Sequence, residues 1–187
     1  MASTADFRNG FVLEFKNGLY TIVEFQHVKP GKGGAFVRTK LKNVSTGAVI
    51  DYTFRAGESI TEVRLERRRF QYLYAEGDLY YCMDNETYEQ IPVNGAAFGG
   101  GTDLLQENMD VTLLMKEERV LLAELPNFIE AEITETDPGV RGDTVSGATK
   151  PASIGSGATV NVPLFLNVGD RIRIDTRTRG YMERVSS

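Results

Sequence analysis

Few side chains in this 187-residue sequence have the type and spacing that catalysis requires. The only histidine, His27, has no cysteine or carboxylate at ligand spacing, and the only cysteine, Cys82, lies among apolar and aromatic neighbours. Carboxylates are frequent between residues 64 and 127, but none is paired with a base or a nucleophile, so they are typical of a solvated face. We therefore expect no catalytic residue, no metal site and no cofactor.

Lys32 is the remaining candidate, because it stands between Pro30-Gly31 and Gly33-Gly34 in the stretch "KPGKGG". A Walker phosphate loop needs a glycine five residues before the Gly-Lys pair, a serine or threonine after the lysine, and a helix to follow. Here Gln26 and Gly33 occupy those two positions, and a strand-like run follows. The sequence thus excludes a phosphate loop.

A nucleophilic lysine needs burial in an apolar pocket, and a glycine-flanked tip offers none, so we expect Lys32 to be charged. A plain reversal of the chain explains Pro30, which fixes φ, and the glycines, which tolerate positive φ. It does not explain a lysine at the apex. The functional alternative is a narrow tip that presents one long cationic side chain to a site on another molecule.

The elements around the tip are short β-rich runs separated by turn residues, at 11–15, 19–28, 35–44 and 48–54. Alternation in the third run places Arg38, Lys40 and Lys42 on one face and apolar residues on the other. With Lys29, these cations could lie along a phosphate backbone. A solvated strand face is the plainer alternative.

Similar short runs continue to the end of the chain, which predicts an all-β protein of three barrels, each of about 60 residues. The expected domains are 1–63, 64–127 and 128–187, with charges of +2, −6 and −1. The net charge of −5 and pI near 5.1 argue against a general polyanion binder.

The sequence also predicts a cytoplasmic protein. It shows no secretory signal, no apolar run approaches the ~20 residues that span a bilayer, and a single cysteine fits a reducing compartment.

Three stretches resemble bacterial elongation factor P closely and in order: "VKPGKGGAFVRTKLKN", "YCMDNETYEQI" and "GATVNVPLFLNVGDRIRIDTRTRGYMERV". The resemblance implies an SH3-like (KOW-type) barrel followed by two OB-fold barrels, arranged as an L-shaped mimic of tRNA. It also implies a non-enzymatic factor that binds ribosomes stalled at consecutive prolines, between the peptidyl-tRNA and exit sites, and promotes peptide-bond formation.

The resemblance assigns roles to individual residues. Lys32 matches the apex that many members modify, and Pro30, Gly31, Gly33 and Gly34 match the rest of the tip. A third-domain loop with Gly142, Asp143 and Thr144 would face the exit-site codon region. The implied partners are the ribosome, through rRNA and ribosomal proteins, the peptidyl-tRNA and a Lys32-modifying enzyme. We expect a monomer and no membrane contact.

Three alternatives stay open from the sequence. A paralogue could share the fold and act on other stalls. The hypusine-containing archaeal and eukaryotic factor has two barrels, whereas this chain has room for three. An enzymatic or ligand-binding barrel could use the glycine-rich loop 94–101, although no nucleophile–base pair supports it.

Overall fold

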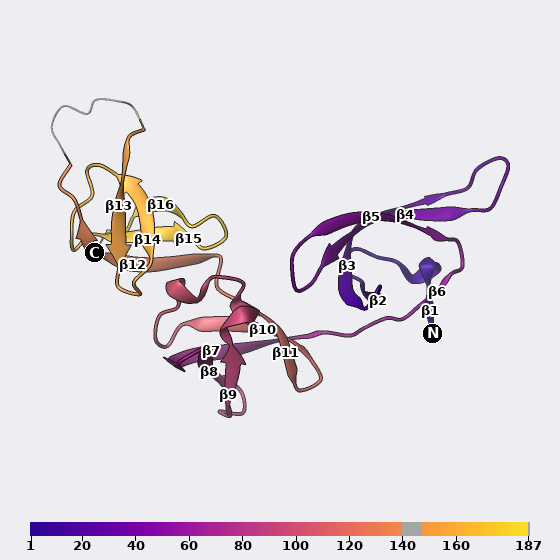
Figure 1. Cartoon of the computed structure of the whole chain (residues 1–187), viewed down its shortest axis with the longest axis horizontal. Helices are drawn as coiled ribbons and strands as arrows, with labels where there is room; N and C mark the ends of the chain where they lie inside the picture. Colours follow the sequence, from indigo (N-terminus) through magenta and orange to yellow (C-terminus); the bar gives the residue numbers. More distant parts are fainter. Residues whose placement is uncertain (140–146, 187) are drawn as a thin grey trace. The chain divides into compact units, whose positions relative to one another are not determined.

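The computed structural model describes residues 1–139 and 147–186. In these residues the secondary structure is β-strand, with three short 3-10 turns (Figure 1). The turns are η1 (Thr4–Asp6), η2 (Gly95–Phe98) and η3 (Thr102–Leu104). The prediction of an all-β protein is confirmed. None of the helical segments in the described residues is long and apolar enough to cross a membrane.

By its contacts the chain divides into two compact units: Met1–Arg68 with Leu113–Leu122, and Arg69–Thr112 with Ala123–Ser187. The four sheets below are described one at a time.

The first large sheet is an antiparallel meander of four strands in the order β2-β3-β4-β5. Its strands are β2 (Val12–Phe15), β3 (Gly18–Val28), β4 (Phe36–Asn43) and β5 (Val49–Arg55). A two-stranded sheet pairs β1 (Ala2–Ser3) with β6 (Ser59–Ile60). Both sheets contribute to one apolar core, formed by Phe7, Phe11, Leu13, Ile22, Val37, Leu41, Phe54 and Ile60.

The second large sheet has five strands in the order β11-β10-β7-β8-β9. Its strands are β7 (Glu66–Glu76), β8 (Leu79–Asp84), β9 (Gln90–Asn94), β10 (Asp110–Lys116) and β11 (Arg119–Glu124). The register of β7 on β8 shifts between Tyr72 and Tyr74, where a β-bulge adds one residue.

The third large sheet has the order β14-β13-β12-β15-β16. Its strands are β12 (Phe128–Thr136), β13 (Thr149–Ile154), β14 (Thr159–Pro163), β15 (Arg171–Asp175) and β16 (Gly180–Arg184). Val160, Val162, Ile172 and Ile174 are all buried in its core. Leu104, from η3, lies in the same core and is 1% exposed.

Candidate functional site

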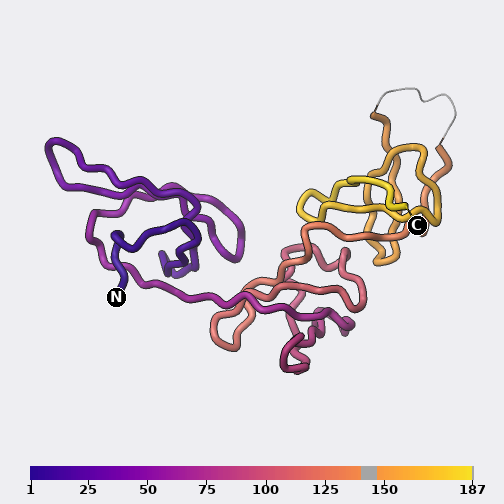
Figure 2. The backbone as a smooth tube through the Cα atoms, turned by 180° about the vertical axis from the view of Figure 1, so that it is seen from behind, coloured from indigo at the N-terminus to yellow at the C-terminus, as the bar shows by residue number. Residues whose placement is uncertain are grey.

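The candidate site is the β3–β4 hairpin and the loop at its end. The two strands pair antiparallel as far as Val28 opposite Phe36, so residues 29–35 form a loop beyond the last pair. The hairpin leaves the body of its sheet as a long narrow projection, which Figures 1 and 2 show from opposite sides. Regular pairing up to the loop gives the tip a stiff support, although the tip is far from the core.

The tip itself is thin and solvent-exposed. Residues 29–34 are all exposed, and Gly33 has a φ of +102°, a conformation that favours glycine. A Cβ atom added at Gly31, Gly33 or Gly34 would meet no described atom within 4 Å. The glycines therefore relieve no crowding within this chain. They keep the tip slender, which matters only if it enters a confined space elsewhere.

Lys32 stands exposed at the apex of this loop. Among the described residues, it forms no hydrogen bond or ion pair, so its ammonium group is available to a partner. A long side chain with three donors and no acceptor suits phosphate or carbonyl oxygens on another molecule.

Strand β4 carries the predicted alternation. Val37, Thr39 and Leu41 are 0%, 4% and 0% exposed, whereas Arg38 and Lys40 face solvent, as does Lys42. The hydroxyl of Thr39 donates to the Tyr52 carbonyl oxygen at 2.8 Å, which satisfies the one polar group on the buried face. The cationic residues are thus held on one face by a well-packed strand.

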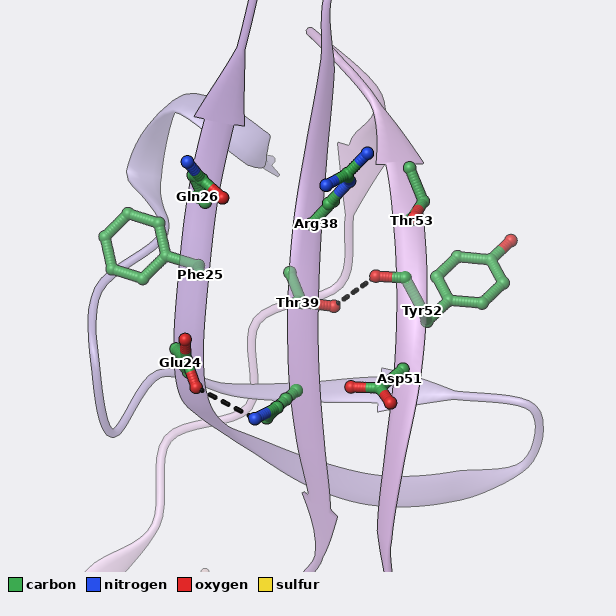
Figure 3. A pocket seen from close by; sticks show the side chains of 9 residues that line it. Glu24, Phe25, Gln26, Arg38, Thr39, Asp51, Tyr52 and Thr53 are labelled. Atoms are coloured by element: carbon green, nitrogen blue, oxygen red, sulfur yellow. Dashed lines mark hydrogen bonds and ion pairs between the residues drawn. The ribbon is translucent and has the colours of Figure 1, made fainter.

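The neighbouring strands place acids beside this cationic face. Glu24 on β3 and Asp51 on β5 are both in register with Lys40, so a carboxylate lies on each side of it (Figure 3). Lys40 Nζ lies 3.2 Å from Glu24 Oε2. These residues line a shallow open pocket of about 360 Å³ on the outer face of the sheet. The sequence predicts that Lys40 is available to RNA, but it does not reveal either acid, because the alignment of Glu24 and Asp51 with Lys40 depends on how the strands pair.

Arg38 has a different environment. Its cross-strand neighbours are Gln26 and Thr53, both uncharged, and its guanidinium carbon lies 5.5 Å from the centre of the Phe36 ring. Aromatic contact orients a guanidinium without neutralising it. In the described part of the chain, no carboxylate pairs with Arg38, so it is better placed than Lys40 to bind a phosphate.

Arg55 is a further cation of this face that the sequence-based prediction did not include. Arg55 ends β5 directly opposite Phe36, which places it on the same outer face as Arg38 and close to the base of the tip. The sequence pattern could have revealed this position, because successive side chains of a strand point to opposite faces and Asp51, Thr53 and Arg55 therefore share one face.

The only histidine and the only cysteine of the sequence show no geometry that suits catalysis or metal binding. His27 is exposed and lies edge-on to Phe25, with ring centres 5.7 Å apart. Cys82 is fully buried, and burial raises the pKa of its thiol to about 12. Over residues 1–139 and 147–186, no three His, Cys, Asp or Glu side chains gather in a way that could hold a metal ion.

The glycine-rich loop 94–101 is filled by its own packing. It forms η2, whose first residue, Gly95, is so close to Tyr80 that a Cβ would lie 2.9 Å from the ring. Phe98 is 5% exposed and lies against the same ring. The loop thus packs as structure, and nothing in its geometry favours the enzymatic alternative. Gly142, Asp143 and Thr144 lie outside the described residues.

Comparison with known families matches nearly the whole chain. The family described as "Elongation factor P (EF-P) KOW-like domain" matches residues 3–60, and "Elongation factor P (EF-P) OB domain" matches residues 65–123. "Elongation factor P, C-terminal" matches residues 129–184.

Individual relatives agree with these matches. Proteins named Elongation factor P from Pelotomaculum thermopropionicum and Ruminiclostridium cellulolyticum are 52% and 54% identical over 185 residues, covering 99% of this chain and all of theirs. A solved translation initiation factor eIF-5A family protein from Naegleria fowleri aligns with a TM-score of 0.51 at 15% identity. That alignment covers 66% of this chain and 96% of the other, and it supports the fold alone.

Proposed function

The chain belongs to the elongation factor P family of translation factors, and from this premise we propose that it acts on ribosomes stalled at consecutive prolines. In this proposal it binds between the peptidyl-tRNA and exit sites. Lys32, bare or modified, then reaches the CCA end of the peptidyl-tRNA and holds it in a reactive position. The ribosome supplies the chemistry, and this chain supplies no catalytic residue.

The observation that carries the proposal is the way the hairpin presents Lys32. The tip is thin and supported by paired strands, and no atom of the described residues crowds its glycines. Proline is a poorly placed nucleophile because its ring is rigid, so the reacting groups are badly aligned. Holding one of them in position can lower a barrier by several kcal/mol, on the order of what good intramolecular alignment achieves.

The cations behind the tip give the proposal its RNA contacts. Lys29, Arg38, Lys40 and Lys42, with Arg55, would lie along the phosphate backbone of the peptidyl-tRNA or the rRNA. Such contacts position a protein and carry no base specificity, and salt weakens them. Because Glu24 pairs with Lys40, we expect Arg38 to contribute more than Lys40.

We further propose three domains at 1–63, 64–127 and 128–187. Each matched family segment falls inside one of these ranges, and each range contains most of one large sheet. The assignment of Gly142–Thr144 to the exit-site codon region rests on family resemblance alone. Ribosomal proteins, peptidyl-tRNA and a Lys32-modifying enzyme are the proposed partners, and the cytoplasm, where translation occurs, is the proposed location.

A reconstituted translation system tests the proposal. A message that encodes three consecutive prolines is translated with and without this protein, beside a matched message in which alanines replace the prolines. We expect the protein to speed synthesis across the prolines and to leave the alanine message unchanged. Equal effects on both messages, or none on either, would overturn the proposal.

A further inference from the structure

Strand β8 has apolar side chains on both of its faces. Tyr80 and Cys82 face the core, as the burial of Cys82 and of its partner Tyr72 shows. The alternate residues Leu79, Tyr81 and Met83 point to the opposite, outer face. A sheet with one solvated face normally has polar residues there, so this face departs from the usual pattern.

The neighbouring strands extend the apolar surface. Tyr81 is in register with Tyr74 on β7 and with Pro92 on β9, so the three form one row across the sheet. The rings of Tyr74 and Tyr81 are stacked, 4.7 Å apart at 16°. Tyr74 and Leu79 are 46% and 40% exposed. We call Tyr74, Leu79, Tyr81, Met83 and Pro92 the tyrosine face.

The position of this face is one that binds ligands in many proteins. Residues 65–123 match an OB domain, and OB folds bind oligonucleotides or oligosaccharides on the face of their second and third strands. In this domain those strands are β8 and β9. Exposed aromatic rings there usually stack on the bases of single-stranded nucleic acid.

The charges around the face oppose that use. Residues 69–112 contain eight acidic side chains and one basic side chain, Arg69. Glu76 lies directly across from Leu79 at the edge of the face, and Asp78 follows in the turn. Neither acid forms an ion pair with another described residue. This local field repels phosphates and attracts cations.

We propose that the tyrosine face is a docking surface for an arginine-rich protein segment. A guanidinium group can stack on a tyrosine ring while it pairs with a carboxylate, and an ammonium group does only the second of these well. Stacked rings beside Glu76 and Asp78 provide both kinds of contact within one patch. The surface differs from the Lys32 hairpin in sign of charge, in sheet and in partner.

Calorimetric titration of the purified full chain tests this, with nona-arginine, nona-lysine and a nine-nucleotide single-stranded oligouridine as probes. We expect nona-arginine to bind at least fivefold more tightly than nona-lysine, and oligouridine not to bind this face. Tyr74→Ala and Tyr81→Ala should each lower the affinity for nona-arginine at least fivefold, whereas Tyr81→Phe should leave this affinity unchanged. These residues lie outside the core, and circular dichroism checks that the variants fold.

Tyr88 offers a matched control. It is 72% exposed in the β8–β9 turn, away from the stacked pair, and its φ of +61° is one that asparagine tolerates, so Tyr88→Asn is a suitable change. We expect this variant to bind nona-arginine like the unmodified chain. If Tyr81→Ala binds as tightly as Tyr88→Asn, attraction to the net negative charge explains the binding and the proposal fails. Oligouridine binding that Tyr74→Ala or Tyr81→Ala abolishes would also overturn it, in favour of nucleic acid.

Discussion

The ammonium group of Lys40 lies 3.2 Å from the carboxylate of Glu24, its register partner on the adjacent strand. Both side chains are at least half exposed, so the pair adds little to stability. The pair instead weakens the binding of phosphate by Lys40, because Glu24 competes with any phosphate that approaches the ammonium group. Replacing Glu24 with glutamine should therefore tighten binding to the ribosome by about 1.4- to fivefold, the range that corresponds to an exposed ion pair worth about 0.2–1 kcal/mol.

Filter binding or fluorescence anisotropy at several salt concentrations measures this effect. Glu14→Gln is the matched control, because it removes one exposed acid from β2 and not from the strands that flank β4. If the two variants bind equally, the local competition between Glu24 and phosphate is disproved.

Replacing Lys32 with alanine should abolish the relief of proline stalls. It should leave the free energy of unfolding within about 0.5 kcal/mol of that of the unmodified chain, because the side chain is exposed and forms no hydrogen bond or ion pair with the described residues. Peptide synthesis across three prolines gives the first quantity, and chemical denaturation gives the second. Lys116→Ala, which removes an exposed lysine of β10 outside the hairpin, controls for the loss of one positive charge and should keep full stall relief. Full stall relief by the Lys32 variant would show that the tip acts without its lysine.

The sequence predicted the strands of the hairpin and the two faces of β4, because alternation with period two is a local property of the chain. It could not predict that Glu24 and Asp51 flank Lys40, since register depends on how separate strands pair. The bulge between Tyr72 and Tyr74 was hidden for the same reason, and it decides that Tyr74 stacks on Tyr81. Leu104 was missed because a short turn shows no periodicity.

Cys82 should make stability depend on alkaline pH. Burial raises the pKa of its thiol from 9.0 to about 12, so above pH 9 the unfolded chain loses this proton while the folded chain keeps it. The contribution of the protonated thiol to the free energy of unfolding is thus fully present below pH 9 and is lost as the pH rises toward 12. Thermal unfolding between pH 8 and pH 11 should show a steeper loss of Tm for the unmodified chain than for Cys82→Ala. If Tm falls with pH equally in both proteins, the Cys82 thiol does not contribute to the pH dependence of stability.

Gly139 should not tolerate a side chain. A Cβ there would lie 2.5 Å from the carbonyl oxygen of Leu164, a backbone atom that cannot swing away. Gly139→Ala should lower the free energy of unfolding by about 1–3 kcal/mol, as overpacking does. Gly155→Ala is the control, because a Cβ at that position meets no described atom within 4 Å. Equal stability of the two variants in urea would contradict the close contact.

Leu104 should couple the unfolding of two segments that the family matches treat as separate. It belongs to η3, within residues 65–123, yet it is 1% exposed in a core formed otherwise by residues 129–174. Two polar contacts support the same junction: Gln106 Nε2 donates to the Glu130 carbonyl at 3.0 Å, and Arg179 pairs with Asp103.

Leu104→Ala should lower the free energy of unfolding by about 2–5 kcal/mol, as large-to-small core changes do. Because the lost contacts lie between the two segments, calorimetry should then resolve two transitions where the unmodified chain and the conservative variant Leu104→Met show one. A single transition at lower temperature in Leu104→Ala would mean that the polar contacts alone keep the segments coupled.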